Sequence, residues 1–137
     1  MAHQEILKLR TARRGTVEIT REIAAVVSRA NLQSGLVNVF VRHTSCSVII
    51  TENADPSVRR DLETLARRWA PDGDAEYVHD MEGDDDMAAH ARAVLTASSL
   101  SVPIADSEML LGTWQGIFLW EHRTHAHTRE IVVTVTG

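Results

Sequence analysis

Most of the seven histidines in this chain of 137 residues stand beside carboxylate or hydroxyl residues. Imidazole is the commonest metal ligand in proteins and titrates near neutral pH, so such neighbours suggest a metal site or an acid–base site. Asp86 and His90 are four residues apart in a predicted helix, which places both on one face. His79 precedes a Glu82-Gly83 turn that can fold it back onto that face. Together the three predict a site for Zn²⁺ or a similar divalent ion; the alternative is a surface histidine beside an acidic helix start.

A second candidate segment, His43-Thr44-Ser45, follows a predicted strand at a point where polar side chains can turn into a cleft. The imidazole of His43 can bind a metal ion, and the two hydroxyl groups can contact phosphate. The alternative is a turn in which Thr44 and Ser45 bond to nearby backbone groups. The candidates for both catalysis and metal binding are therefore His43, His79, Asp86 and His90.

Glu121 ends a predicted strand of otherwise apolar residues. Because strand side chains alternate, Glu121 shares a face with Ile117 and Leu119, and a carboxylate on an apolar face is costly unless it is paired. Arg129 or Arg123 can supply the partner. The pair is either structural or part of a site in which Glu121 takes part in catalysis and Arg129 binds substrate.

Trp114 and Gln115 lie between two glycines, Gly112 and Gly116, in a predicted loop. Such a loop can take a defined shape and line a pocket, which makes both residues candidates for substrate binding. Packing of the tryptophan against the core is the alternative. Cys46 has no neighbour in the sequence that marks an activated thiol, so we expect a small buried side chain there.

The strands that must position these residues follow from alternating apolar positions. Val37, Val39 and Val41 mark the firmest of them, with polar or bulky residues between. About seven strands are predicted, over residues 5–11, 17–19, 36–42, 100–105, 109–111, 117–121 and 131–136, with 48–51 as a continuation or partner of the third.

Two or three helices are predicted between these strands. Thr20 caps the first, which runs to about Asn31 with Gly35 as its stop signal. Asp55-Pro56 starts the second, because aspartate is a preferred N-cap and proline suits the first turn. The third follows the acidic run 84–86. The predicted inward residues are Ile23, Val26, Val27 and Ala30, then Val58, Leu62, Leu65 and Trp69, then Met87, Ala91, Val94 and Leu95. Such helices with largely antiparallel strands make an α+β domain.

The composition fits one globular domain over residues 1–137, because 44% of residues are hydrophobic and 24% are charged. A net charge of -5 argues against nucleic-acid binding. No apolar run approaches the roughly 18 residues that span a bilayer, and the N-terminus lacks the apolar stretch of a signal peptide. With a single cysteine, the protein is expected to be cytoplasmic, without a membrane or nucleic-acid partner.

Short motifs in a fixed order resemble those of the YjbQ family, small proteins described as secondary thiamine-phosphate synthases. They cover nearly the whole chain and are His43-Thr-Ser, Thr51-Glu-Asn-Ala-Asp-Pro with Val58-Arg-Arg-Asp, His79-Asp-Met-Glu-Gly-Asp-Asp-Asp-Met, Gly112-Thr-Trp-Gln-Gly-Ile and Glu121-His-Arg, followed by Arg129. The chain departs from the usual pattern at Cys46, Ala88 and Glu130. Glu130 stands where a second basic residue is common, which weakens tight phosphate binding beside Arg129.

The resemblance implies a compact α+β fold with a β-sandwich-like core and two to three helices, assembled as a homotrimer. It also implies an enzyme that joins hydroxymethylpyrimidine diphosphate to thiazole phosphate and releases pyrophosphate, an activity that the family description calls secondary. A divalent metal ion, Zn²⁺ or Mg²⁺, held by Asp85 and Asp86, would serve that reaction. The phosphate groups of the metabolite would be contacted by His43, Thr44, Ser45 and Arg129. The alternatives are a metal-dependent hydrolase of a small metabolite and a non-enzymatic trimer that binds one.

Overall fold

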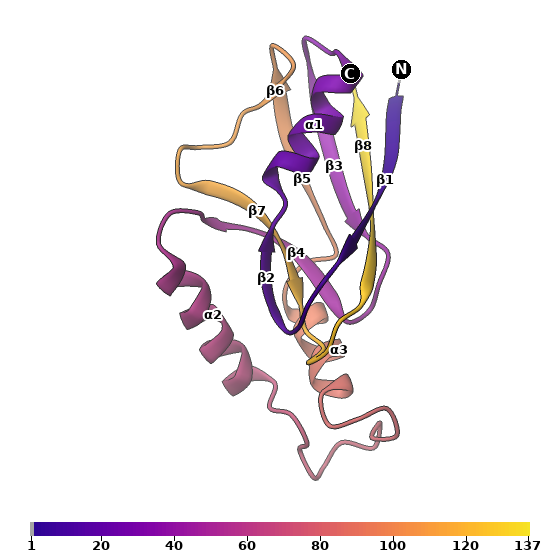
Figure 1. Ribbon diagram of the computed structural model, residues 1–137, viewed down its shortest axis with the longest axis vertical. Coiled ribbons are helices and arrows are strands. Elements are labelled where there is room, and N and C mark those ends of the chain that lie inside the picture. Colours follow the sequence, from indigo (N-terminus) through magenta and orange to yellow (C-terminus); the bar gives the residue numbers. More distant parts are fainter. Residues whose placement is uncertain (1) are drawn as a thin grey trace.

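Two antiparallel sheets and three helices account for residues 2–137, the part of the chain that the computed structural model describes (Figure 1). The elements are β1 (Ala2–Arg10), β2 (Gly15–Glu18), α1 (Thr20–Ala30), β3 (Ser34–Val41), β4 (Cys46–Glu52), α2 (Pro56–Trp69), α3 (Asp86–Leu95), β5 (Ser99–Ala105), β6 (Glu108–Met109), β7 (Gln115–Glu121) and β8 (Thr128–Thr136). One sheet has the strand order β1-β8-β3-β5-β6 and the other β2-β7-β4. All pairings among these strands are antiparallel, which confirms the predicted α+β class.

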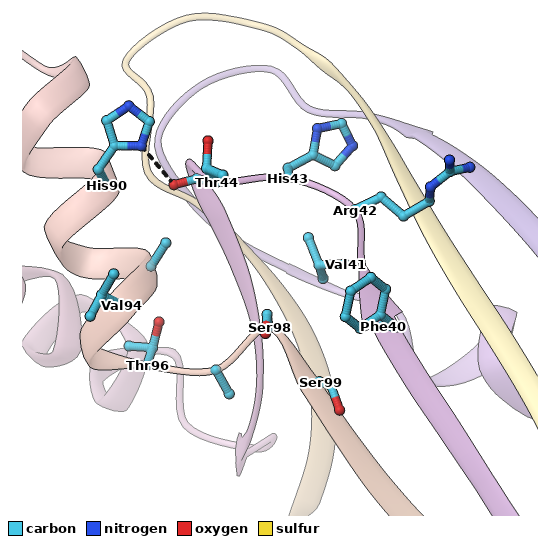
Figure 2. Close-up of a pocket in the computed structure, with 12 residues that line it drawn as sticks. Phe40, Val41, Arg42, His43, Thr44, His90, Val94, Thr96, Ser98 and Ser99 are labelled. Atoms are coloured by element: carbon cyan, nitrogen blue, oxygen red, sulfur yellow. Dashed lines mark hydrogen bonds between the residues drawn. The ribbon is translucent and has the colours of Figure 1, made fainter.

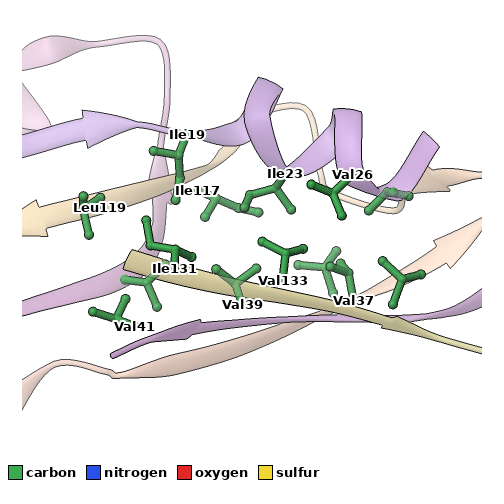
Figure 3. Packing of buried hydrophobic residues seen from close by; sticks show 14 of the residues in the cluster. Ile19, Ile23, Val26, Val37, Val39, Val41, Ile117, Leu119, Ile131 and Val133 are labelled. Carbon is green, nitrogen blue, oxygen red and sulfur yellow. The ribbon is translucent and has the colours of Figure 1, made fainter. Parts of the chain in front are cut away.

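The main hydrophobic core lies between the five-stranded sheet and the layer formed by α1 and β7 (Figure 3). Val37, Val39 and Val41 of β3 are all buried, as their alternation predicted. They share one cluster with Ile23 of α1 and Leu119 of β7. Burying a side chain of this size stabilises the fold by about 1.5–3 kcal/mol. The packing of this cluster therefore holds in place the strands that carry the candidate site residues.

The end of α1 near Asn31 is confirmed, but the predicted cap and the predicted stop signal are not. Thr20 is the first helical residue, and its hydroxyl accepts a hydrogen bond from the Ile117 N–H (2.9 Å) in place of capping the helix. The helix ends at Asn31, whose backbone is left-handed with a φ of 52°. Gly35, the predicted stop signal, lies inside β3, where a Cβ atom would come within 2.1 Å of the Thr136 carbonyl oxygen. The close approach of β8 explains this glycine better than helix termination does.

The start of α2 is confirmed, but its predicted apolar face is not buried within the chain. Asp55 accepts a hydrogen bond from the Ser57 N–H (2.9 Å) immediately before the proline that opens the helix. Ala66 is buried, whereas Trp69 is 54% exposed, because α2 stands beside the three-stranded sheet and away from the core (Figure 1). No helix within residues 2–137 is long and apolar enough to cross a membrane.

The buried face of α3 is also not the predicted one. Asp86, Ala88, Ala89 and Arg92 are buried, whereas Val94 and Leu95 are exposed. Arg92 can turn inward because its Nη1 donates to the Glu63 carboxylate (2.5 Å), which compensates part of the cost of burying a charge. With this face of α3 turned inward, Asp86 is buried and His90 is partly exposed.

Candidate functional site

The structure brings His79, Asp86 and His90 together at the start of α3, and we call these three residues the open cluster. One ligand atom from each lies within 4.8 Å of the others. Both imidazole Nε2 atoms meet the same oxygen, Asp86 Oδ2, at 2.7 Å from His79 and 3.1 Å from His90. Asp86 and His90 are about one helical turn apart, whereas His79 comes from the loop between α2 and α3. The donor set of two nitrogens and one oxygen fits a transition-metal ion.

The ring of His90 is fixed by its other nitrogen. Nδ1 bonds to the carbonyl oxygen of Thr44 at 3.0 Å, in the turn between β3 and β4 (Figure 2). A carbonyl oxygen can only accept, so Nδ1 carries a proton and Nε2 of the neutral ring keeps its lone pair. Histidines that bind metal ions almost always have such a partner, because it sets both the tautomer and the ring orientation.

Arg123, in the segment after β7, holds Asp86 from the opposite side. Its Nη1 lies 2.9 Å from Asp86 Oδ1, which leaves Oδ2 to meet the two imidazoles. Burial raises the pKa of Asp86, but its side-chain hydrogen bonds, with His79 first and then Glu82, and the charge of Arg123 outweigh burial. The pKa of Asp86 therefore lies below its usual range, and the carboxylate is charged at neutral pH.

Asp85 anchors the same segment and does not join the open cluster. Its Oδ2 accepts hydrogen bonds from Arg123 Nε (2.9 Å) and from the Thr124 N–H (2.8 Å). Burial raises the pKa of Asp85, but these donors lower it further, so it lies well below its usual range. The sequence suggests Arg123 only as a partner of Glu121. Its position directly after Glu121-His122 was the one available signal that it stands near a site.

The open cluster is accessible from solvent. The side chains of His79 and His90 are 45% and 30% exposed, whereas that of Asp86 is 3% exposed. His90 also lines a cavity of about 900 Å³, whose other walls include His43, Thr44 and residues 96–99 (Figure 2). His90 is therefore the one member of the open cluster that borders this cavity, whereas His79 lines a separate pocket.

His43 lines the same cavity but does not point into the open cluster. Its Nε2 accepts a hydrogen bond from the Glu130 N–H (2.8 Å), and its Nδ1 faces Arg129 Nη1 at 3.4 Å. Both ring nitrogens are thus turned toward β8. The geometry does not support His43 as a metal ligand, because neither nitrogen is directed at the other three candidates.

Glu121 is paired with Arg129, one of the two partners that the sequence suggested. Glu121 Oε1 accepts from Arg129 Nε (2.8 Å) and from the Thr11 hydroxyl (2.7 Å), and its Oε2 pairs with Arg129 Nη2. Arg129 Nη2 also donates to Ser45 Oγ (2.9 Å). We call Thr11, Ser45, Glu121 and Arg129 the buried cluster.

The buried cluster leaves little room for catalysis by Glu121. The residue is 0% exposed, and both of its oxygens already accept hydrogen bonds. Burial raises the pKa of Glu121, but the bonds from Arg129 and Thr11 bring it below the usual range. Glu121 is therefore a charged structural partner that orients Arg129, which differs from the catalytic role predicted for it.

Trp114 and Gln115 lie at the opposite end of β7 from Glu121. The strand runs from Gln115 to Glu121, and seven residues of extended chain span about 20 Å. Gln115 Oε1 accepts the Gly112 N–H (2.8 Å) and closes the loop, while Trp114 is 63% exposed. The geometry of one chain does not bring these two predicted substrate-binding residues to the open cluster.

Comparisons with known proteins agree with the motif pattern. Residues 5–137 match the family model described as "UPF0047 protein YjbQ-like". A UPF0047 protein of Synechocystis is 47% identical over 98% of this chain and 92% of its own length, and YjbQ of Escherichia coli O157:H7 is 40% identical over 100% and 99%. A crystal structure from Clostridium acetobutylicum, described as an uncharacterized conserved protein of the YjbQ/UPF0047 family, superposes with a TM-score of 0.88 at 31% identity, over 96% of this chain and 99% of that one.

These relatives overturn the predicted activity while they establish the family. The relatives from Synechocystis, Escherichia coli and Methanothermobacter thermautotrophicus carry only UPF0047 names, and none of these names indicates a thiamine-phosphate synthase. The assignment of that activity, which rested on the family description and not on a feature of the site, is wrong. What the match of residues 5–137 and the identity along nearly the whole chain do establish is kinship: this chain belongs to the YjbQ-like UPF0047 family.

Proposed function

We propose that this protein binds a divalent transition-metal ion through His79, Asp86 and His90, and that the ion serves hydrolysis of a small anionic metabolite. The observation that carries the proposal is the convergence of two Nε2 atoms on Asp86 Oδ2, with His90 Nδ1 held by the Thr44 carbonyl. Because the Thr44 carbonyl holds the proton of His90 on Nδ1, Nε2 of the neutral ring turns its lone pair toward the Asp86 carboxylate, and a positive charge between them makes this contact favourable. A divalent cation supplies that charge and accepts the lone pairs of both imidazoles together with the Asp86 carboxylate.

The donor types favour zinc over magnesium. Two of the three ligands are imidazole nitrogens, which suit Zn²⁺ and its neighbours in the periodic table, whereas Mg²⁺ prefers oxygen ligands and keeps most of its waters. Arg123 supports this choice, because it occupies Asp86 Oδ1 and leaves a single oxygen for the ion. We therefore expect a site with three protein ligands, as in catalytic zinc centres.

Three protein ligands and two partly exposed imidazoles leave one side of the site open. A zinc ion with an open position lowers the pKa of a bound water toward neutrality, which is the chemistry that hydrolases use. The cavity beside His90 supplies a place for the substrate, and Thr44 fixes the ring that borders it. This arrangement favours hydrolysis over simple storage of an ion, in which a closed set of four ligands is usual.

Metal content tests the proposal directly. Untagged protein is loaded with zinc, dialysed and measured by elemental analysis, beside His90→Ala and the control His125→Ala, which changes an exposed histidine outside the open cluster. We expect about one ion per chain in the parent and in the control, and loss of the ion in His90→Ala with an unchanged circular dichroism spectrum. A parent protein that retains no ion contradicts the proposal.

Hydrolysis is tested separately on the zinc-loaded protein. Turnover of p-nitrophenyl phosphate and p-nitrophenyl acetate is measured before and after treatment with a chelator, and again after zinc is restored. We expect activity with at least one ester that disappears with the ion and returns with it. Binding of zinc without turnover of either ester would leave the metal site standing and remove the hydrolytic part of the proposal.

We also propose that the protein associates with copies of itself, as a homotrimer of the kind that the family resemblance implies. Ile6, Val132 and Phe40 lie opposite one another on β1, β8 and β3, so they form an apolar row on the outer face of the five-stranded sheet. Ile6 and Phe40 are 51% and 44% exposed within one chain. Light scattering should give the trimer mass for the parent and a smaller mass for Phe40→Asp.

The cytoplasmic location stays a prediction.

A further inference from the structure

The protonation state of His43 can be read from its contacts. Nε2 lies 2.8 Å from the backbone nitrogen of Glu130, and a backbone N–H can only donate. Nε2 must therefore hold a lone pair, which leaves the single proton of the neutral ring on Nδ1. Burial and the charge of Arg129 both lower the pKa of His43, in agreement with a neutral ring.

Nδ1 then faces a group with which it cannot form a hydrogen bond. Its neighbour at 3.4 Å is Arg129 Nη1, and a guanidinium nitrogen is always a donor. The contact therefore brings two N–H donors side by side. Arg129 Nε and Nη2 are taken up by Glu121 and Ser45, but within residues 2–137 no oxygen accepts from Nη1.

The two donors are held in place by the other hydrogen bonds of their side chains. Arg129 is 4% exposed and is held on its Nε and Nη2 edge by the Glu121 carboxylate, so Nη1 is directed away from that negative charge. His43 is held by the backbone of β8. Arg129 cannot turn aside without losing buried hydrogen bonds, and His43 cannot do so without losing a partly buried one. Two donors held in this way suit an acceptor that carries negative charge.

The location joins this pair to the proposed metal site. His43 and His90 line the same cavity, and the residue between them in Figure 2, Thr44, bonds to His90 through its carbonyl. Arg42 also lines the cavity and adds a positive charge, which its 3.9 Å approach to the Glu130 carboxylate partly offsets. Arg129 is not among the residues that line the cavity, so the pair meets the cavity at His43. An elongated anionic molecule that binds there would have to enter on the Nδ1 side of His43 to reach both donors.

We infer that His43 Nδ1–H and Arg129 Nη1–H form an oxyanion subsite, which binds a carboxylate or phosphate oxygen of the substrate. The inference rests on the proposed function and deepens it, because it names the second contact point of the substrate. The hydrolysed bond lies at the ion held by the open cluster, and a separate anionic group of the same molecule lies between His43 and Arg129.

The test uses full-length protein from which metal has been removed with a chelator, so that it does not depend on the metal site. The ¹⁵N spectrum of the histidine side chains first gives the tautomer of His43, expected to be protonated at Nδ1. Inorganic phosphate and acetate are then titrated separately. We expect the Nδ1 resonance of His43 to shift in a saturable manner with at least one of them, and the tighter anion names the class of the group.

The matched variants are His43→Ala, which removes one donor, and Arg42→Ala, which removes a nearby charge without touching the pair. We expect His43→Ala to bind the preferred anion about tenfold more weakly or worse, since it loses a charge-assisted hydrogen bond, and Arg42→Ala to keep most of the affinity. A proton on Nε2, resonances that neither anion moves, or equal affinity in the parent and His43→Ala would overturn the inference. None of these results depends on whether zinc binds.

Discussion

The open cluster and the buried cluster contain the same chemistry in two different settings. Asp86 and Glu121 are both buried carboxylates, and cationic or proton-bearing side chains surround each. The partners of Asp86 Oδ2 are two histidines that reach solvent, whereas those of Glu121 are an arginine and a threonine inside the protein. An imidazole can give up its proton to make room for a metal ion, and a guanidinium cannot. Burial of a carboxylate therefore does not by itself indicate a metal site. Partners that can give up a proton in exchange for a metal ion are the more informative feature.

The largest effect should come from Glu121→Gln. The substitution leaves the Arg129 guanidinium buried without its counter-charge, which typically costs about 3–5 kcal/mol of folding free energy. Urea denaturation followed by tryptophan fluorescence measures this loss. Asp86→Asn is the matched comparison and should cost less, because Arg123 keeps its ion pair with Asp85. Equal losses in the two variants would contradict the distinction between the clusters.

The next largest effect should be the stabilisation of the folded protein by zinc bound at the open cluster. An ion that binds only the folded protein should raise the free energy of unfolding by about 2.7 kcal/mol when its free concentration is 100 times Kd. The parent protein should show the increase, and His79→Ala should not, because it lacks one of the three ligands. A similar increase in both proteins would show that zinc binds elsewhere on the chain.

A third effect concerns His122, a histidine that is fully buried and bonds to Ser47 Oγ through Nε2 (2.8 Å). Burial, assisted by the charge of Arg92, lowers its pKa from 6.5 to about 3. The unfolded chain takes up a proton below pH 6.5 and the folded chain does not, so stability falls as the pH drops from 6.5 toward 3. The slope from this residue should reach about 1.4 kcal/mol per pH unit.

The His122 contribution is isolated by a difference measurement. Urea midpoints are compared between the parent and His122→Phe from pH 7 to pH 4.5, because the lowered pKa of His43 adds to the slope in the same direction and cancels in the difference. Paired carboxylates such as Asp85 lose their contribution below this range, as the pH falls from the unfolded pKa toward the folded one. Parallel curves for the two proteins would refute the assignment.

The smallest effect should be that of Trp114→Ala. The side chain is 63% exposed and lies at the far end of β7 from both clusters, so its removal should change the free energy of unfolding by no more than about 0.5 kcal/mol. The affinity of a single folded chain for zinc should be the same in Trp114→Ala as in the parent. A loss of bound zinc in Trp114→Ala would show that the loop reaches the open cluster from a neighbouring copy.

The sequence predicted what local spacing can encode. Alternation located β3 and its buried face, Asp55-Pro56 located the start of α2, and the interval between Asp86 and His90 located the open cluster. The contacts of His43, which the sequence suggested as a metal ligand, could not be predicted, because both come from β8, more than 80 residues later. The inward face of α3 was not predicted for a similar reason. Arg92 turns inward to bond to Glu63 of α2, a contact that no local sequence pattern indicates.

The position of His79 has a consequence for kinetics. It lies in the loop between α2 and α3, which the Gly73 N–H closes onto the Asp84 carbonyl oxygen (2.9 Å), while Val78 and Met81 on either side of it are almost fully exposed. The loop therefore has little packing of its own to hold it down near His79. If the proposed ion binds, opening of this segment removes one of its three ligands, so the dwell time of the metal should shorten as the loop opens more often.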